Sequence, residues 1–353
     1  MTKLESKLKI YLAEPMKYTP FSQRTFLSQL SQEGFILVKD TTKADLFVSR
    51  KIQHLIPLIN KYGKQKEYLI WTHEPRLDTN FNKIKYLQNS IKIHIMNCYT
   101  QDVYCDNYKY AAIMKEKSLQ PPNYHEFSRE KGKKIAMIAS ARFSGWQLIQ
   151  NNVNIDLSVL RTKIAMNGYK LGKVDLYGPG WPRGSAIENF RRPTHENRRN
   201  KKVNILEKYH FSLCFENTNI EYYCTEKIWE CLAAGCLPIY YGNRAIYEDF
   251  PRRSFLDYNE FQDSNALFDY IDKMDIQEYN IRLQLCLDTC KKILNKKGPE
   301  HSSKKLKSKI LYKLKAIWLN QPKQKQKLNE IYQSKLVWLR QVQKEIINLQ
   351  SSI

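Results

Sequence analysis

The chain has 353 residues, and its 58 Lys and Arg against 35 Asp and Glu give a formal net charge of +23. This length suits two domains with separate cores. The charge favours a polyanionic partner: nucleic acid, an anionic lipid surface or a phosphorylated small molecule. No apolar run is long enough to span a membrane, and the first residues lack the apolar core of a signal peptide, so we expect a cytoplasmic protein, soluble or peripheral on a membrane.

The cysteine pattern argues for a reducing compartment. The chain has eight cysteines but no C-x-x-C pair, and several fall within the apolar pattern of predicted strands and helices. Buried free thiols show this pattern more often than zinc ligands or disulfides do. We therefore expect reduced structural thiols.

Up to residue 96, short apolar runs alternate with stretches of helical spacing. The predicted strands are 7–14, 35–38, 44–49, 68–71 and 91–96, and the predicted helices are 21–33 and 52–62. Strands that alternate with helices predict a parallel sheet. Residues 115–134 are then polar and broken by two prolines, which is typical of a linker. We predict domains at 1–130 and 131–295, followed by a tail at 296–353.

The second domain repeats this alternation. The predicted strands are 134–140, 174–178, 211–215, 236–241 and 253–257, and the predicted helices are 156–167, 203–209, 226–235, 264–274 and 277–294. The run from residue 178 to 202 is read as irregular and exposed. Residues 211–242 form one strand–helix–strand unit, and ligands of such sheets bind beyond the carboxyl ends of the strands.

Lys227 and Arg161 are the predicted phosphate contacts. Thr225 can cap the helix that follows it, and the free N–H groups and the dipole of the first turn favour a bound anion near Lys227. Arg161, on the helix after strand 134–140, can hold a second edge of a pyrophosphate with its planar fork. A lysine at a helix start is also a common surface residue, so this spacing alone leaves both readings open.

Two neighbours of Lys227 suit the rest of a nucleotide sugar. Glu226 would repel a phosphate, but its carboxylate can accept hydrogen bonds from both hydroxyls of a ribose diol. Tyr223 precedes the helix and can lie along the phosphates or the base, although it is one of 23 tyrosines and an ordinary loop position is equally open.

Glu74 is the candidate general base. It follows strand 68–71, and Pro75 biases its backbone toward an extended conformation. A positioned carboxylate can take the proton of a sugar hydroxyl. His73 is a rival base, and Asp78 is a candidate to orient acceptor hydroxyls. Each of these residues is also a common type in an exposed loop.

The tail carries a basic amphipathic pattern. Leu306, Ile310, Leu314 and Ile317 recur at helical spacing among lysines, and a second stretch repeats the spacing at Leu328, Tyr332, Leu336, Leu339, Val342, Ile346 and Leu349. Such a helix either binds an anionic membrane surface or a partner, or it packs as a solvated face on the preceding domains. The sequence leaves both open.

Three motifs within 211–242 resemble a family signature. They are Phe215-Glu-Asn-Thr218, Tyr223-Cys-Thr-Glu-Lys-Ile228 and Gly235-Cys-Leu-Pro-Ile-Tyr-Tyr-Gly242. They resemble the donor-binding signature of the α-1,3/4-fucosyltransferases, glycosyltransferase family 10, with Cys224 in place of the usual valine. Ser158-Val-Leu-Arg161, Val174-Asp-Leu-Tyr-Gly178 and Trp71-Thr-His-Glu-Pro75 are similar to further segments of that family.

The resemblance implies a GT-B fold: two Rossmann-like α/β domains that face each other across a cleft, with the acceptor on the first and GDP-fucose on the second. It also implies an inverting transfer of fucose, with O3 of N-acetylglucosamine as the favoured acceptor position. Glu74 would reach the cleft from the first domain as the base. Arg161 and Lys227 would stabilise the leaving diphosphate, and Asn217, Tyr223 and Glu226 would hold the donor.

The resemblance also bears on cofactors and partners. No D-x-D dyad precedes the donor segment, so we expect no metal requirement. Bacterial members carry basic tails that dock on membranes, and residues 304–349 look similar. The acceptor stays open between N-acetyllactosamine on lipopolysaccharide, a glycan-core N-acetylglucosamine and other sugars.

Two rival functions follow from the same residues. The first is another GT-B transferase with a different nucleotide sugar, because diphosphate clamps do not specify the sugar. The second is a nucleic-acid-binding protein, suggested by the charge of +23. The second is disfavoured because Glu74, Glu216 and Glu226 gather where a phosphate backbone would have to bind.

Overall fold

The computed structural model describes residues 8–87, 90–120, 122, 124–189 and 195–321, together with residues 326, 333, 335–337 and 339; the side chains of residues 117 and 195–199 are excepted. The chain divides into two compact units. Unit 1 comprises Met1–Thr72, Asn82–Met96 and Lys307–Ile353, and unit 2 comprises His73–Phe81 and Asn97–Leu306.

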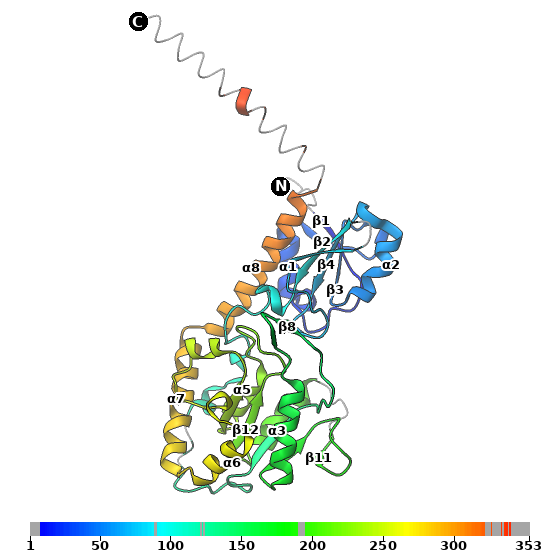
Figure 1. The fold of residues 1–353 in the computed structure, drawn as a ribbon. Coiled ribbons are helices and arrows are strands. Elements are labelled where there is room, and N and C mark those ends of the chain that lie inside the picture. The colour runs from blue at the N-terminus through cyan, green and yellow to red at the C-terminus, as the bar shows by residue number, and fades with distance from the viewer. Residues whose placement is uncertain are drawn as a thin grey trace, which may run out of the picture. The chain divides into compact units, whose positions relative to one another are not determined.

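Unit 1 is built on a six-stranded sheet of order β2-β1-β3-β4-β6-β5. Its strands are β1 (Leu8–Leu12), β2 (Phe35–Leu37), β3 (Leu46–Ser49), β4 (Glu67–Trp71), β5 (Ile84–Leu87) and β6 (Ile91–Met96). All pairings are parallel except that of β5 with β6. Helices α1 (Arg24–Gln32) and α2 (Ile52–Tyr62) lie on opposite faces of this sheet (Figure 1), so the central strand β3 is buried along its whole length.

Helix α8 (Gly298–Leu319) contains the first half of the predicted amphipathic tail. Its side chains Ile310, Leu314 and Ile317 are fully buried, and Lys315 Nζ lies 2.8 Å from Glu33 Oε2, at the end of α1. The apolar face of this stretch therefore packs on the protein, and binding of its lysines to a membrane surface stays a prediction.

The second half of the predicted amphipathic pattern is described in part. Leu336 is half-buried and Leu339 is 54% exposed. The other predicted apolar positions, Leu328, Tyr332, Val342, Ile346 and Leu349, lie outside the described residues. None of the helices in the described part of the chain is both long and apolar enough to cross a membrane.

Unit 2 contains a fully parallel six-stranded sheet of order β11-β10-β7-β12-β13-β14. Its strands are β7 (Ile135–Ile138), β10 (Val174–Tyr177), β11 (Ala186–Glu188), β12 (Phe211–Phe215), β13 (Leu237–Tyr241) and β14 (Leu256–Asp257). The predicted α/β class with two largely parallel sheets is confirmed.

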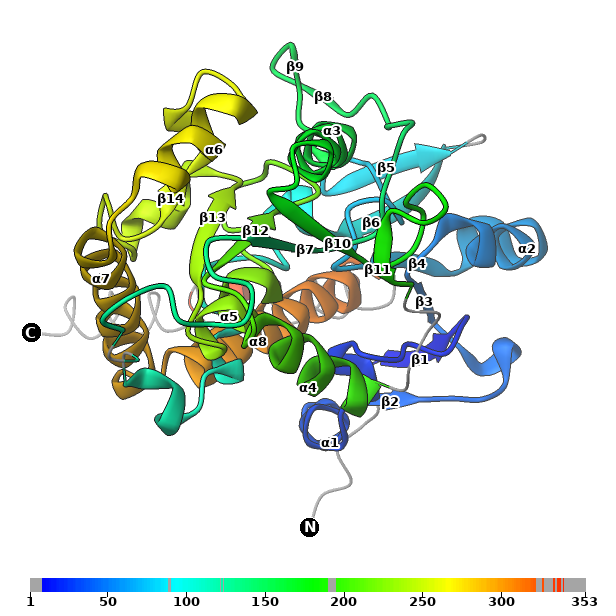
Figure 2. The same ribbon diagram turned by 90° about the horizontal axis from the view of Figure 1, so that it is seen from below.

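Helices cover both faces of the second sheet. They are α3 (Ser158–Lys170), α4 (His195–Leu206), α5 (Glu226–Ala233), α6 (Ser264–Lys273) and α7 (Ile276–Asn295). Figure 2 shows α3 and α6 on one face and α4, α5 and α7 on the other. The predicted strand–helix–strand unit is β12–α5–β13. Helix α5 ends because Gly235 adopts a left-handed φ of 67°, which lets the N–H of Cys236 reach the carbonyl of Cys231 at 3.0 Å.

The structure differs from the sequence prediction in several places. Strands β5 and β11 were not predicted, because β5 is partly exposed along its length and β11 has three residues in a polar run. Helix α4 begins at His195, well before the predicted residue 203, because its charged sequence hides the helical spacing. The units also do not divide at residue 130: Ile113 and Met114 are buried in the core of unit 2.

All eight cysteines are free, and seven of them are buried. None of the eight cysteines forms a disulfide in the structure, in line with the prediction of structural thiols. Burial raises the pKa of the Cys290 thiol to about 12, so this thiol stays protonated and behaves as an apolar side chain.

Candidate functional site

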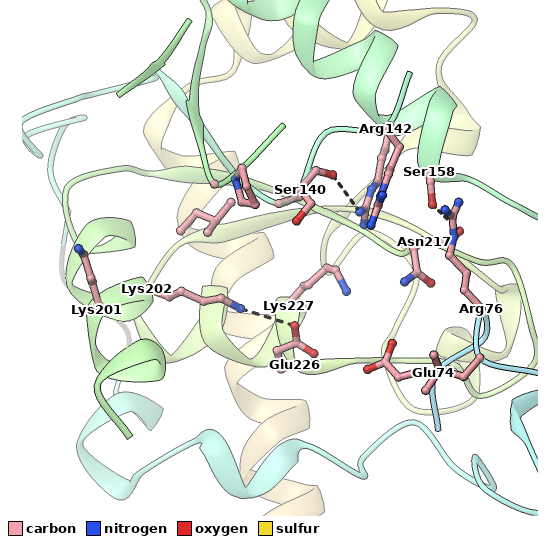
Figure 3. A pocket seen from close by; sticks show the side chains of 16 residues that line it. Glu74, Arg76, Ser140, Arg142, Ser158, Lys201, Lys202, Asn217, Glu226 and Lys227 are labelled. Atoms are coloured by element: carbon pink, nitrogen blue, oxygen red, sulfur yellow. Dashed lines mark hydrogen bonds and ion pairs between the residues drawn. The ribbon is translucent and has the colours of Figure 1, made fainter. Parts of the chain in front are cut away.

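A cavity of about 650 Å³ opens in unit 2 at the carboxyl ends of β7, β10 and β12. Its walls come from the segment after β4, the loops after β7 and β10, and helices α3, α4 and α5. Figure 3 shows Lys201 and Lys202 toward one end, Glu74 and Arg76 toward the other, and Lys227 between them. Five predicted site residues line this one cavity: Glu74, Arg161, Asn217, Glu226 and Lys227.

The start of α5 is organised by Glu216 rather than by a helix cap. Glu216 is fully buried at the end of β12, and it accepts hydrogen bonds from the backbone N–H of Thr225 at 2.8 Å and from its hydroxyl at 2.8–2.9 Å. The prediction that Thr225 caps the helix is wrong, since its side chain makes no cap bond. The N–H groups of the first turn therefore have no side-chain cap and can bind an anion.

Lys227 is held by the same carboxylate. Its Nζ lies 2.8 Å from Glu216 Oε2 and 2.5 Å from Thr225 Oγ1. Burial alone would lower the pKa of Lys227, but the charges of Glu216 and Glu226 outweigh it and raise that pKa. Lys227 is thus a fixed cation at the wall of the cavity before any ligand binds.

Glu226 is paired with a lysine that the sequence analysis missed. Lys202 Nζ, on α4, lies 3.5 Å from Glu226 Oε1 and 2.7 Å from Glu230 Oε2. Burial alone would raise the pKa of Glu226, but Lys227 and Lys202 hold it well below its usual range. The carboxylate is therefore ionised and available as a hydrogen-bond acceptor. Nothing in the sequence indicated this role for Lys202, because residues 178–202 were predicted to be an irregular, exposed segment.

Arg161 is the exception to this pattern of paired charges. It is 6% exposed, and its Nη atoms reach only the carbonyls of Phe215 and Ser140, at 3.4 Å each. Its Nε is buried without a hydrogen-bond partner, and no carboxylate in the described part of the chain pairs with it. Burial lowers its pKa, but a guanidinium still remains charged. The charge of Glu216 offsets part of the cost of burying this cation without a direct contact, and an anion in the cavity would supply the direct partner that the guanidinium lacks.

Arg142 adds a second unpaired guanidinium at the wall of the cavity. Its loop follows β7 and is fixed to α3 by a hydrogen bond of 2.9 Å from the Arg142 N–H to Thr162 Oγ1. No described carboxylate forms an ion pair with its exposed side chain. No sequence motif indicated a role for Arg142, because only the long-range contact with α3 directs its loop to the cavity.

Glu74 reaches the cavity on a segment that packs with unit 2. The segment is His73–Phe81. Arg76 Nη2 lies 2.6 Å from Asp156 Oδ2, the hydroxyl of Tyr99 donates to the carbonyl of Pro75 at 2.9 Å, and the hydroxyl of Tyr104 donates to the carbonyl of His73 at 3.3 Å. Glu74 thus lies in compact unit 2, whereas the sequence prediction placed it in the first domain. Its carboxylate is 54% exposed.

His73, Asp78 and Tyr223 do not contribute to the described lining of the cavity. His73 Nε2 lies 3.6 Å from Glu74 Oε1. Asp78 is buried and accepts a hydrogen bond of 2.5 Å from Asn97 Nδ2, so it helps hold the Glu74 segment. The ring of Tyr223 is buried at 4.8 Å from that of Tyr104, and burial raises its pKa far above the usual range. Their predicted contacts with substrate stay predictions.

A metal site is not apparent in the same region. No group of three His, Cys, Asp or Glu among the described residues is arranged to hold a metal ion. The cations that line the cavity are those of the protein: Arg76, Arg142, Arg161, Lys201, Lys202 and Lys227.

Residues 147–284 match the family described as glycosyltransferase family 10 (fucosyltransferase) C-term. This range is a family 10 fucosyltransferase domain. It contains Arg161, Asn217 and Lys227 and begins beyond Glu74. The resemblance that the sequence motifs carried is therefore confirmed.

Relatives of this domain have names that describe different transfers, an α-(1,3) linkage in one and protein O-fucosylation in the other. The α-(1,3)-fucosyltransferase FucT of Helicobacter pylori is 39% identical over 70 residues, which cover 20% of this chain and 15% of that protein. The GDP-fucose protein O-fucosyltransferase 3 of Gallus gallus is 33% identical over 115 residues, 32% of this chain and 24% of that protein. The chain thus matches less than a quarter of the length of either relative.

Among solved structures, a crystal structure of an α1,3-fucosyltransferase with GDP-fucose is similar to this chain. The TM-score is 0.46 at 20% sequence identity, and the alignment covers 80% of this chain and 83% of the other.

Proposed function

We propose that the chain is an inverting fucosyltransferase that moves L-fucose from GDP-β-L-fucose to a hydroxyl of a glycan acceptor, O3 of N-acetylglucosamine being the favoured position. The family 10 domain supports a fucosyl donor. The observation that carries the proposal is Arg161, a buried guanidinium without a carboxylate partner in a cavity that also contains Lys227 and Glu74.

The cations of the cavity suit the diphosphate of the donor. Negative charge develops on the β-phosphate as the bond to fucose breaks, and fixed cations stabilise that charge without having to reorganise. Lys227 is already held by Glu216, whereas Arg161 gains a counter-ion when the diphosphate enters. The uncapped N–H groups of α5 and the fork of Arg142 suit the remaining phosphate oxygens.

The polar residues beside the cations suit the rest of the donor. Glu226 is ionised and lines the cavity, so its carboxylate can accept hydrogen bonds from a ribose diol. Asn217 also lines the cavity, and its Oδ1 accepts a hydrogen bond from Thr218 Oγ1 at 2.9 Å, which leaves its amide N–H groups to donate to the donor. Tyr223 would act from behind this wall by packing against Tyr104.

In the transfer itself, Glu74 is the base. Its carboxylate takes the proton of the acceptor hydroxyl as that oxygen attacks the anomeric carbon from the side opposite GDP. The bond between the anomeric carbon and the phosphate oxygen breaks, and its electron pair leaves with GDP. The β-linked donor becomes an α-linked fucoside, and the protonated Glu74 returns its proton to water.

We also propose that the reaction needs no metal, because protein cations supply the charge. EDTA should leave the rate of transfer from GDP-fucose unchanged within about twofold, since no step depends on a bound ion. A loss of activity that Mg²⁺ or Mn²⁺ restores would contradict this part of the proposal.

We also propose that the acceptor lies at a membrane surface. This part of the proposal is based on the basic tail of the chain. The lysines of 304–315 would contribute electrostatic attraction to anionic lipids, while the buried Ile310, Leu314 and Ile317 are committed to the protein core. Tyr312 and Leu319 on the same helix are 78% and 40% exposed, so they are available for contact with a lipid surface.

The decisive experiment incubates the purified chain with GDP-fucose and a panel of glycan acceptors and determines the linkage of the product. An α-fucoside and free GDP are the expected products. Parallel assays use GDP-mannose and UDP-sugars with the same acceptors. Transfer from one of these donors and none from GDP-fucose would overturn the donor assignment but retain the diphosphate site.

A further inference from the structure

The loop between β7 and α3 exposes an unusual group of apolar side chains. Phe143 is 62% exposed, Trp146 48%, Ile149 50% and Val153 59%. Single exposed apolar residues are ordinary on a protein surface, but an exposed aromatic ring next to a residue that lines a cavity is a candidate for contact with a ligand. The two aromatic residues follow Arg142, whose side chain lines the cavity.

Asp156 fastens Trp146 to the wall of the cavity. The Asp156 side chain is 1% exposed, and its Oδ2 accepts the N–H of Trp146 at 2.8 Å. The same carboxylate accepts the N–H of Ser158 at 2.9 Å and pairs with Arg76 at 2.6 Å. Ser158 and Arg76 both line the cavity, so one buried carboxylate joins the aromatic loop, the start of α3 and the segment that carries Glu74.

Gly145 shows how closely this loop approaches α3. A Cβ atom at Gly145 would lie 2.9 Å from Val159 Cγ2 and 3.3 Å from Asp156 Oδ2, so a larger residue would displace the loop. Trp146 is therefore held in place by backbone contacts, and its side chain is free for another purpose.

The ring of Trp146 lies at the Glu74 end of the cavity. The guanidinium carbon of Arg76 lies 5.8 Å from the ring centroid of Trp146, and Arg76 is two residues from Glu74. Figure 3 shows Arg76 and Glu74 at the opposite end from Lys201 and Lys202. With Arg76 near the ring and the side chain about half exposed, part of the indole remains open to solvent beside the proposed base.

We propose that Trp146 forms an acceptor platform, on which a β-linked pyranose of the glycan acceptor lies. A pyranose has an apolar face of C–H groups and a polar rim of hydroxyls. An indole covers the C–H face, and nearby charged groups meet the rim. The inference rests on the proposed fucosyl transfer, and it identifies which residue presents the accepting hydroxyl to Glu74.

The test compares Trp146→Ala with the wild-type chain. Transfer from GDP-fucose is measured to N-acetyllactosamine, lactose and diacetylchitobiose, and the best acceptor is used for kinetics. We expect Trp146→Ala to raise the acceptor KM about tenfold or more, as removal of a central aromatic contact does. The KM for GDP-fucose and its slow hydrolysis without acceptor should stay unchanged, because the backbone bond from residue 146 to Asp156 survives the substitution.

Two controls separate binding from folding. Trp146→Phe retains a ring and should restore most of the acceptor affinity. Tyr169→Ala removes an aromatic side chain of 38% exposure near the far end of α3 and should change neither KM. A direct readout is ¹⁹F NMR of the chain labelled with 5-fluorotryptophan, in which the Trp146 signal, identified by its absence in Trp146→Phe, should shift on titration with the same saccharide.

The outcomes are distinct for the two proposals. An unchanged acceptor KM in Trp146→Ala, or a Trp146 signal that the best acceptor does not shift, overturns the acceptor platform and leaves the fucosyl transfer intact. GDP-fucose hydrolysis without transfer to any of the three β-linked saccharides also overturns the platform. Absence of both GDP-fucose binding and hydrolysis in the wild-type chain overturns the proposed function itself.

Discussion

Two cationic regions line the cavity of unit 2, and their charges are balanced in different ways. At the start of α5, Lys227 is paired with Glu216, and Lys202 is paired with Glu226 and Glu230. At the start of α3, Arg161 has no carboxylate partner. The first region is complete without a ligand, whereas the second is completed by an anion. This difference indicates where binding energy is gained when a diphosphate enters.

The largest effect is expected from a substitution of the proposed base, which should slow transfer and leave both cationic regions intact. Glu74→Gln should lower the rate of transfer about 10²- to 10⁴-fold, because the amide cannot take the proton of the acceptor hydroxyl. The dissociation constant for GDP-fucose should stay near the wild-type value, since neither region loses a charge. Calorimetric titration and initial rates check this, and a turnover near wild type would rule out Glu74 as the base.

The second prediction compares how a substitution in each cationic region changes the stability of the ligand-free protein. Lys227→Met should destabilise the free protein by about 3–5 kcal/mol, because it leaves the buried carboxylate of Glu216 without its cation. Arg161→Met should cost much less stability than Lys227→Met, because it removes a buried charge that has no carboxylate in direct contact. Urea denaturation without nucleotide measures both.

Thermal shift with GDP is the matched control for that pair. A saturating ligand at a hundredfold excess over its dissociation constant stabilises a protein by about 2.7 kcal/mol. The wild-type chain should show a corresponding rise in Tm, and Arg161→Met should lose most of it. If Arg161→Met destabilised the free chain as much as Lys227→Met, the contrast between a complete and an incomplete region would be wrong.

A smaller effect on stability is expected when the pH is lowered, because Glu226 at the start of α5 then becomes protonated. The folded pKa of Glu226 is held below its usual value of 4.5. Its contribution to stability is therefore present above about pH 4.5 and declines as the pH falls toward the folded pKa. Glu226→Gln should be less stable than wild type at pH 7, and the difference should shrink at pH 3, as urea melts at both values would show. A difference that grew on acidification would contradict the assigned direction of the shift.

The smallest effect on the activity of the cavity is expected from truncation of the C-terminal tail. Removal of residues 322–353 should leave transfer and donor affinity unchanged, since neither cationic region includes them, and should reduce binding to anionic vesicles. A cut after Leu294 would also remove α8 with its buried Ile310 and Leu314, so it should destabilise unit 1. Sedimentation with vesicles and circular dichroism distinguish the two truncations. Unchanged vesicle binding after the shorter cut would remove the tail from the membrane proposal.

The sequence predicted the part of the site that is local in the chain. Asn217, Glu226 and Lys227 follow one strand and begin one helix, and these positions are set by hydrophobic periodicity and the glycine at 235. The resemblance added Arg161 and Glu74. Glu216 was placed at the correct edge, but its bonds to Thr225 and Lys227 depend on side-chain directions that no periodicity encodes.

Long-range contacts explain most of what was missed. The Glu74 segment packs in unit 2 because Arg76 reaches Asp156, 80 residues away in the chain. Arg142 lines the cavity because its N–H reaches Thr162 on α3, and Lys202 because α4 starts at residue 195 in a run of charges without apolar spacing. Each of these depends on tertiary packing, which overrides the local signal that sequence reasoning uses.

The pairing of Arg76 with Asp156 has a consequence for how such a chain can be recombined. The donor cations all lie within 97–306, but Glu74 lies outside that continuous segment, on residues that follow a strand of unit 1. Exchange of 97–306 between relatives would transfer the donor machinery and leave the recipient's own base. Asp156 would travel with the exchanged segment and Arg76 would stay behind. A chimera is therefore expected to keep Glu74 in place only when the residues at these two positions still form an ion pair.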